Sequence, residues 1–161
     1  PQFLLRKECI YWEVKATEIL AAFQREYLTT DVPIRFIDYA ISSDSADTSR
    51  MHGRLTVEIN GEQLELAGTG NGPIDALRDA LGQAGWQDFK LTHYSEHALG
   101  QGTDSTAIAY IQVARNDGTQ RFGVGTHPNI AKASALALIS ALNRTELAAG
   151  VGTTTKAAIV Q

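Results

Sequence analysis

The order of hydrophobic and polar residues predicts one helix first and strands after it. Between residues 17 and 28 apolar side chains recur at helical spacing, and polar ones lie on the opposite side. Pro33 ends this helix, because the residue before a proline is pushed out of helical angles. The apolar side of the helix consists of Ile19, Leu20, Phe23 and Tyr27. Residues 1–33 are therefore predicted to form a helical linker that ends a preceding subdomain.

From residue 34 the pattern changes to short strands separated by turns. Residues 34–42 alternate weakly between apolar and polar side chains. The runs 54–59 and 63–67 flank Asn60-Gly61, which is the strongest short signal for a hairpin. These segments predict an antiparallel sheet of three strands.

A glycine-rich turn joins this sheet to a helix. The turn occupies residues 68–72, and Pro73 follows at the first helical position. A backbone N–H at that position has no partner within the helix, so proline, which lacks one, is tolerated there. We predict that the helix ends at Gly82 or Gly85. Its N-terminus has unpaired amides, which can hold a small anion such as a carboxylate.

The same pattern then occurs a second time. Residues 89–99, 107–114 and 119–125 have the pattern of strands, with an Asn-Asp-Gly turn between the last two. Residues 130–142 are rich in alanine and leucine and predict a second helix, for which Asn143 is the expected stop.

Both halves of the chain therefore contain a strand–strand–strand–helix unit. Pro73 aligns with Pro128, together with the glycines before each, at an offset of 55 residues. One such unit buries too little apolar surface to be stable, so the two should pack together around a pseudo-twofold axis. We predict an α+β domain over residues 34–145, with repeat one at 34–85, repeat two at 86–145 and a flexible tail at 146–161.

Composition excludes several kinds of partner and compartment. The net charge is −4, from 14 basic and 18 acidic residues spread along the chain, so no basic patch for nucleic acid is expected. A hydrophobic content of 43% is ordinary for a globular protein and requires no membrane. The single cysteine, Cys9, cannot form an internal disulfide, which favours a reducing cytoplasm.

Two motifs suggest chemistry that their context does not support. Residues 93–97 match the H-x-x-E-H pattern of zinc hydrolases, with His93, Glu96 and His97 as the chemical groups. Phe89, Leu91 and His93 alternate with polar residues as in a strand, where residues four apart lie about 13 Å from each other. The glycine turn lacks the spacing of a dinucleotide site. We predict no catalytic residue and no metal site, with a zinc hydrolase as the remaining alternative.

Several short motifs occur in an order and spacing typical of a known family. They are Gly70-Asn-Gly-Pro-Ile-Asp-Ala76, Tyr94-Ser-Glu-His-Ala98, Gly102-Thr-Asp104, Gly123-Val-Gly125 and the helix over residues 133–144. Together they resemble the C-terminal regulatory domain of 2-isopropylmalate synthase, over residues 34–144. Residues 23–28 also resemble the helix that precedes this domain in the long form of the enzyme.

The resemblance implies a function as well as a fold of two βββα units. Enzymes of this family condense acetyl-CoA with 2-oxoisovalerate in a metal-dependent TIM barrel, the first committed step of leucine biosynthesis. Leucine inhibits them by binding the dimer of regulatory domains. A TIM barrel takes at least about 200 residues, so this chain is too short to hold one. The resemblance implies a homodimeric leucine sensor that partners a catalytic barrel and has no cofactor of its own, the divalent metal belonging to the barrel.

The resemblance also implies a leucine pocket. The matching positions are Gly70, Gly72, Ile74, Asp75, Leu91, Tyr94, Ala98, Ser105, Ala107 and Ile130. Ser105 is polar where the family often has alanine.

The implied pocket is physically reasonable for leucine. Amides around Gly72 can meet the ligand carboxylate at the positive helix end. Ile74, Leu91 and Ile130 can bury the isobutyl group, which contributes about 2 kcal/mol. The ligand ammonium needs an acceptor, for which Asp75 or a backbone carbonyl can serve.

Two other functions remain open at this point. The same domain could serve a citramalate synthase and bind isoleucine, which needs more room near Ile74 and Leu91. It could also be a structural dimerisation module with a vestigial pocket, in which case no amino acid would alter its dimers.

Overall fold

A computed structural model describes residues 15–28, 31–99 and 105–148 of the chain. Cys9, the Gly102-Thr-Asp104 motif and the predicted tail beyond residue 148 lie outside these described residues. The elements are α2 (Ala16–Phe23), the π-helical turn η1 (Gln24–Leu28), β1 (Ile34–Ser43), β2 (Met51–Ile59), β3 (Glu62–Gly70), α3 (Pro73–Gln83), β4 (Phe89–Leu99), β5 (Thr106–Arg115), β6 (Gln120–His127) and α4 (Ile130–Ala148).

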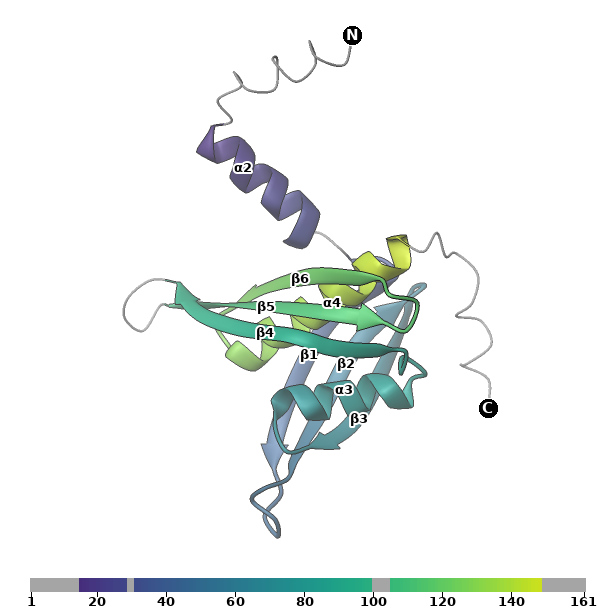
Figure 1. The fold of residues 1–161 in the computed structure, drawn as a ribbon. Helices are drawn as coiled ribbons and strands as arrows, with labels where there is room; N and C mark the ends of the chain where they lie inside the picture. The colour runs from purple at the N-terminus through teal and green to yellow at the C-terminus, as the bar shows by residue number, and fades with distance from the viewer. Residues whose placement is uncertain (1–14, 29–30, 100–104, 149–161) are drawn as a thin grey trace.

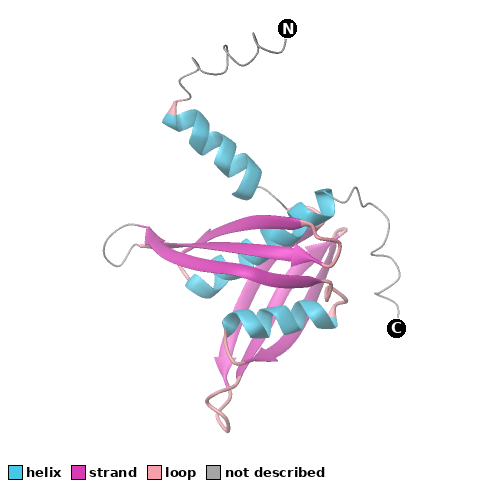
Figure 2. Ribbon diagram, viewed as in Figure 1, coloured by secondary structure: helices cyan, strands magenta, loops and turns pink. Residues whose placement is uncertain are grey.

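The strands form two antiparallel sheets of three, in the orders β1-β2-β3 and β4-β5-β6. We name them sheet A and sheet B. Each is followed by its own helix, α3 after sheet A and α4 after sheet B (Figure 2). The predicted α+β fold of two βββα units, preceded by a helix, is therefore confirmed.

Helix α4 lies between the two sheets and ties the repeats together (Figure 1). It packs on β5 and β6 of its own sheet and also on β1 of sheet A, while α3 packs on β2 and β3. Since both sides of α4 are covered, nearly every residue from Ala133 to Thr145 is buried. The alanine-rich sequence follows from this position, because an enclosed helix is apolar all round and small side chains allow both sheets to approach it.

The glycines of the last strand of each sheet permit a close approach by the helix that follows that sheet. A Cβ at Gly68 would lie 2.2 Å from the carbonyl oxygen of Ala76, and a Cβ at Gly125 would lie 2.1 Å from that of Ala133. Gly68 and Gly125 are therefore structural counterparts, 57 residues apart.

This pairing corrects the alignment predicted from the sequence. Helix α3 begins at Pro73 and α4 begins at Ile130, which is again an offset of 57 residues. The predicted alignment of Pro73 with Pro128, at 55, is wrong by two residues at the helix start. The offset of 55 does hold in the first strands, where the bulge between Phe36 and Asp38 matches the one between Leu91 and His93. Counted between equivalent paired residues, each strand-to-strand connection of repeat two is one residue longer, so the offset grows from 55 to 57 along the unit.

The predicted stop at Asn143 is also wrong, because α4 continues to Ala148. Asn143 is fully buried, and its side-chain amide bonds to the main chain of Ile34 at the start of β1. Asparagine is disfavoured inside helices because its side chain competes for nearby backbone groups. Here a distant strand satisfies the side chain of Asn143, so the helix continues.

The N-terminal helix of the prediction is divided in two. Helix α2 has no buried residue and projects away from the sheets (Figure 1), whereas η1 packs against β6. Among the residues that the structure describes, no helix is long and apolar enough to cross a bilayer.

Candidate ligand-binding site

The residues predicted to line a ligand pocket fall into two groups, one at the start of each domain helix. Gly70, Gly72, Ile74 and Asp75 lie around the start of α3 in repeat one. The second group consists of Leu91, Tyr94, Ala98 and Ala107 on sheet B, Ser105 directly before β5, and Ile130 at the start of α4.

The two helix starts differ in how their amides are satisfied. Gly72 is the N-cap of α3, and among the described residues no side chain caps that helix. In α4 the side chain of Asn129 accepts hydrogen bonds from the amides of Ala131 and Lys132, at 2.9 and 3.2 Å. The first turn of a helix attracts anions through its free amides and its dipole. The start of α3 therefore has the capacity to bind a carboxylate, whereas the amides at the start of α4 are already bonded to Asn129.

Tyr39 fixes the start of α3 from beneath. Its hydroxyl donates a hydrogen bond to the main-chain oxygen of Pro73 at 2.6 Å, and only 2% of the residue is exposed. Burial raises the pKa of the Tyr39 hydroxyl to about 12. The helix start is thereby held against sheet A by a neutral hydrogen-bond donor.

A groove runs from the start of α3 toward the start of β4. Gly70 and Asp75 of the first group line it, beside Phe89 and Lys90 of β4. Its other lining residues are mostly polar: Thr69, Asn71, Arg78, Asp79, Gly82, Gln83, Trp86 and Gln87. The groove therefore presents hydrogen-bonding groups next to the start of α3.

The second group owes its common face to a bulge in β4. Leu91 pairs with Val113 and Tyr94 pairs with Ile111, and the extra residue between them is Thr92. In an unbroken strand residues 91 and 94 would point to opposite sides. The bulge brings both onto the face that packs on α4, and it moves His93 to the other face, so the predicted common face of Phe89, Leu91 and His93 is wrong.

Tyr94 connects β4 to the start of α4. Its hydroxyl lies 3.1 Å from Oγ of Ser134 and donates to a carboxylate oxygen of Glu96. Ser134 donates in turn to the main-chain oxygen of Ile130 at 3.0 Å. Burial, together with the Glu96 carboxylate, raises the pKa of the Tyr94 hydroxyl.

Tyr94 and Tyr39 are counterparts in the repeat, yet their surroundings differ. Tyr39 is buried, whereas Tyr94 is 40% exposed and Ile130, the first residue of α4, is 41% exposed. Repeat one thus fills the space below its helix start with its own side chain, and repeat two leaves an aromatic and an aliphatic surface accessible. That the two groups join into one leucine pocket remains a prediction.

Two residues at this site were not among the predicted pocket residues. Glu96 lies two positions from both Tyr94 and Ala98, so strand alternation alone would have placed it on their face. Ser134 lies 40 positions from Tyr94 in the chain. No local signal could have connected it to that residue.

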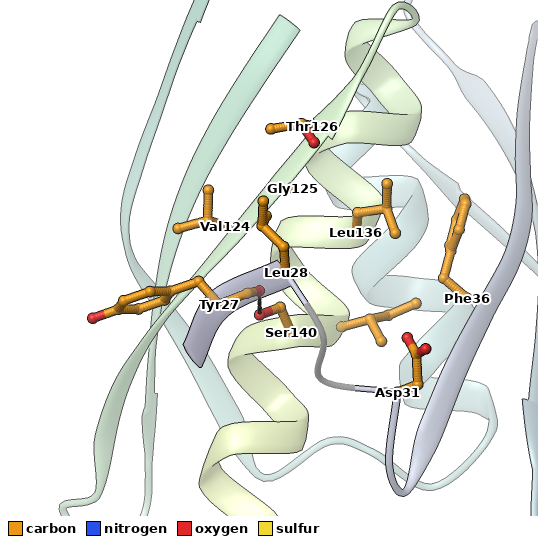
Figure 3. Close-up of a pocket in the computed structure, with 10 residues that line it drawn as sticks. Tyr27, Leu28, Asp31, Phe36, Val124, Gly125, Thr126, Leu136 and Ser140 are labelled. Atoms are coloured by element: carbon orange, nitrogen blue, oxygen red, sulfur yellow. Dashed lines mark hydrogen bonds between the residues drawn. The ribbon is translucent and has the colours of Figure 1, made fainter. Parts of the chain in front are cut away.

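A cavity of about 120 Å³ lies elsewhere, between η1 and the domain (Figure 3). Phe36, Val124, Leu136 and Ile139 give it apolar walls. At its edge Oγ of Ser140 donates to the main-chain oxygen of Tyr27 at 2.8 Å, the dashed line in Figure 3. None of the predicted pocket residues lines this cavity, so it belongs to the joint between linker and domain.

The H-x-x-E-H motif does not form a metal site. His93 and His97 make ring contacts with Phe122 and Tyr110 on the outer face of sheet B, while Glu96 reaches Tyr94 on the inner face. Within residues 15–28, 31–99 and 105–148 no three His, Cys, Asp or Glu side chains gather as metal ligands would. The geometry therefore opposes the zinc hydrolase alternative.

The comparisons with known proteins agree on one family. Residues 13–146 match the model of the LeuA allosteric (dimerisation) domain. The chain is 40% identical over 133 residues to a 2-isopropylmalate synthase of Paraburkholderia xenovorans, covering 82% of this chain and 22% of that protein. The synthase of Mycobacterium leprae is 39% identical over 132 residues, or 82% of this chain and 21% of that protein.

A third relative, the 2-isopropylmalate synthase of an Azoarcus species, is 42% identical over 145 residues. That match covers 87% of this chain and 24% of the relative. The chain thus spans less than a quarter of the length of these curated relatives.

Proposed function

Since the chain belongs to the LeuA allosteric (dimerisation) domain family, we propose that it is the regulatory domain of a 2-isopropylmalate synthase and binds L-leucine for feedback inhibition. The catalytic partner is a metal-dependent barrel that condenses acetyl-CoA with 2-oxoisovalerate. The regulatory domain works as a homodimer in the cytoplasm and needs no cofactor of its own.

The observation that carries the proposal is the accessible apolar surface at the start of α4. The bulge at Thr92 places Leu91, Tyr94 and Ala98 on one face of β4, and Tyr94 and Ile130 keep about two fifths of their surface exposed. Covering such a surface with an isobutyl group contributes about 2 kcal/mol. A branched aliphatic side chain is therefore the ligand group that this surface favours.

The start of α3 supports the other end of the ligand. Its amides have no side-chain cap, and Pro73 at the first position leaves the following amides of Ile74 and Asp75 to bind a carboxylate. An α-amino acid carries a carboxylate and a branched chain on one carbon. The proposal requires that the α3 group and the Tyr94 group meet around a single ligand, within one chain or across the dimer.

Inhibition requires that leucine bind one state of the assembly better than another. Coupling free energies between two sites are typically about 1 to 3 kcal/mol. Leucine is thus expected to reduce synthase activity by lowering the population of the active state, without touching the catalytic residues.

Calorimetric titration of the full chain with L-leucine tests the proposal. Saturable heat is expected, and no heat up to millimolar leucine would contradict it. Competition with L-isoleucine separates the proposal from a citramalate synthase domain, for which isoleucine would bind more tightly. Sedimentation with and without leucine tests the structural-module alternative, in which dimers form but no amino acid changes them or binds to them.

A further inference from the structure

Glu96 lies on the inner face of β4 between two residues of the predicted pocket. After the bulge Tyr94 pairs with Ile111, Glu96 with Ala109 and Ala98 with Ala107. Residues two apart in a strand share a face, so the carboxylate stands between the phenol of Tyr94 and the methyl of Ala98. Glu96 is exposed to solvent in the structure.

The hydrogen bonds around Tyr94 need one more hydrogen than their members supply. Tyr94 contacts Glu96 and Ser134, and Ser134 contacts the main-chain oxygen of Ile130, which makes three contacts. A tyrosine and a serine hydroxyl carry one hydrogen each, while an ionised carboxylate and a carbonyl carry none. Only two of the three contacts can be hydrogen bonds at one time. The cluster's own hydrogens therefore leave one contact unfilled, and the exposed carboxylate of Glu96 is the member that can accept from a donor outside the cluster.

We propose that the carboxylate of Glu96 binds the ammonium group of the amino-acid ligand, which acts as the outside donor. This inference rests on the proposed function. An ammonium group has three N–H donors and a positive charge, and hydrogen bonds between charged partners are the stronger ones. When the ligand binds, Tyr94 turns its hydrogen to Ser134, Ser134 keeps its bond to Ile130, and Glu96 accepts from the ligand.

Glu96 fits this role better than Asp75, the other carboxylate of the predicted site. Asp75 lies in the first turn of α3, where the positive end of the helix dipole already stabilises a negative side chain. It also lies where the ligand carboxylate is expected, and two negative groups repel each other there. Glu96 stands apart from that helix start, on the strand that carries Tyr94 and Ala98.

Two ligands distinguish a direct contact from a structural role. L-Leucine and 4-methylpentanoate have the same isobutyl and carboxylate ends, but only leucine has the ammonium. In calorimetric titrations of the full chain, Glu96→Gln is expected to weaken leucine binding about ten- to hundred-fold and to leave 4-methylpentanoate binding unchanged. Glu96→Asp, which keeps the charge on a shorter side chain, should lose less affinity than Glu96→Gln.

Glu65→Gln is the matched control. Glu65 is also exposed and on a strand, but it pairs with Arg54 on the outer face of sheet A, so neither ligand should respond to its loss. Equal weakening of both ligands by Glu96→Gln, or full leucine affinity in that variant, would overturn the inference and leave the proposed function standing. A wild-type chain that binds no leucine would overturn both.

Discussion

The side-chain amide of Asn143 forms two hydrogen bonds with the main chain of Ile34, 109 residues away. Asn143 Oδ1 accepts from the amide of Ile34 at 3.0 Å, and Nδ2 donates to its carbonyl oxygen at 2.7 Å. β1 is an edge strand of sheet A. At this end of β1 the side chain of Asn143 takes the place of a neighbouring strand. The last helix of repeat two is thereby locked to the first strand of repeat one.

Asn143→Ala is expected to destabilise the domain by about 2–4 kcal/mol. It leaves a buried N–H and a buried C=O without a partner, and each such group costs about 1–3 kcal/mol. Chemical denaturation followed by circular dichroism measures the loss. Asn71→Ala, at an exposed position, is the control and should change little; similar stability in both variants would show that the bonds to Ile34 contribute nothing.

Gly68→Ala and Gly125→Ala are each expected to destabilise the domain by about 2–3 kcal/mol or to prevent folding. In both cases a methyl group would lie within 2.2 Å of a helix carbonyl oxygen, so the helix must move off its sheet. Gly72→Ala, where no atom of the described residues lies within 4 Å of the added carbon, should cost less than about 1 kcal/mol. Thermal melts of the three variants decide the matter, and an unchanged melting temperature for Gly125→Ala would refute the proposed equivalence of the two glycines.

Stability should fall as the pH rises from about 10 to about 12, because of Tyr39. Its pKa is raised from 10.0 to about 12 by burial, so the unfolded chain loses the phenol proton first. The stability that the protonated Tyr39 hydroxyl contributes is complete below the pKa it has in the unfolded chain. That stability is lost as the pH rises through its pKa in the folded protein. Tyr39→Phe should show a smaller decrease over this range in urea denaturation curves, since it has no proton to lose. Parallel curves for the two proteins would count against this origin.

Arg144 is expected to hold η1 on the domain. Its guanidinium donates to the main-chain oxygen of Glu26, pairs with that residue's carboxylate at 3.0 Å and lies 4.1 Å from the centre of the Tyr27 ring. Arg144→Ala should increase amide hydrogen exchange across residues 24–28 by several-fold, while β2 remains protected.

Arg144→Lys is the matched variant for that experiment. Lysine keeps the charge but loses the planar fork that stacks on a ring and binds two oxygens at once. It should give an intermediate exchange rate. If Arg144→Ala left the exchange of residues 24–28 unchanged, Ser140 and its bond to Tyr27 would be the sufficient anchor.

The sequence by itself determined the units of this protein. Asn60-Gly61 predicts the hairpin between β2 and β3, and Pro73 after a glycine turn predicts the start of α3. The strand over residues 89–99 was predicted with its observed bounds. These signals are local, since each depends on the backbone angles or side-chain alternation of a few neighbouring residues, and such preferences act wherever the segment lies.

Only the tertiary structure decided which side chains meet. The bulges after Phe36 and Leu91 reverse the alternation within their strands, and this reversal brings Leu91 and Tyr94 onto one face. Asn143 continues a helix that its residue type would end, because Ile34 satisfies its amide. The contact of Tyr94 with Ser134 likewise joins distant segments. Such features depend on contacts between residues far apart in the chain, whose free energy exceeds the small local preferences that a sequence pattern records.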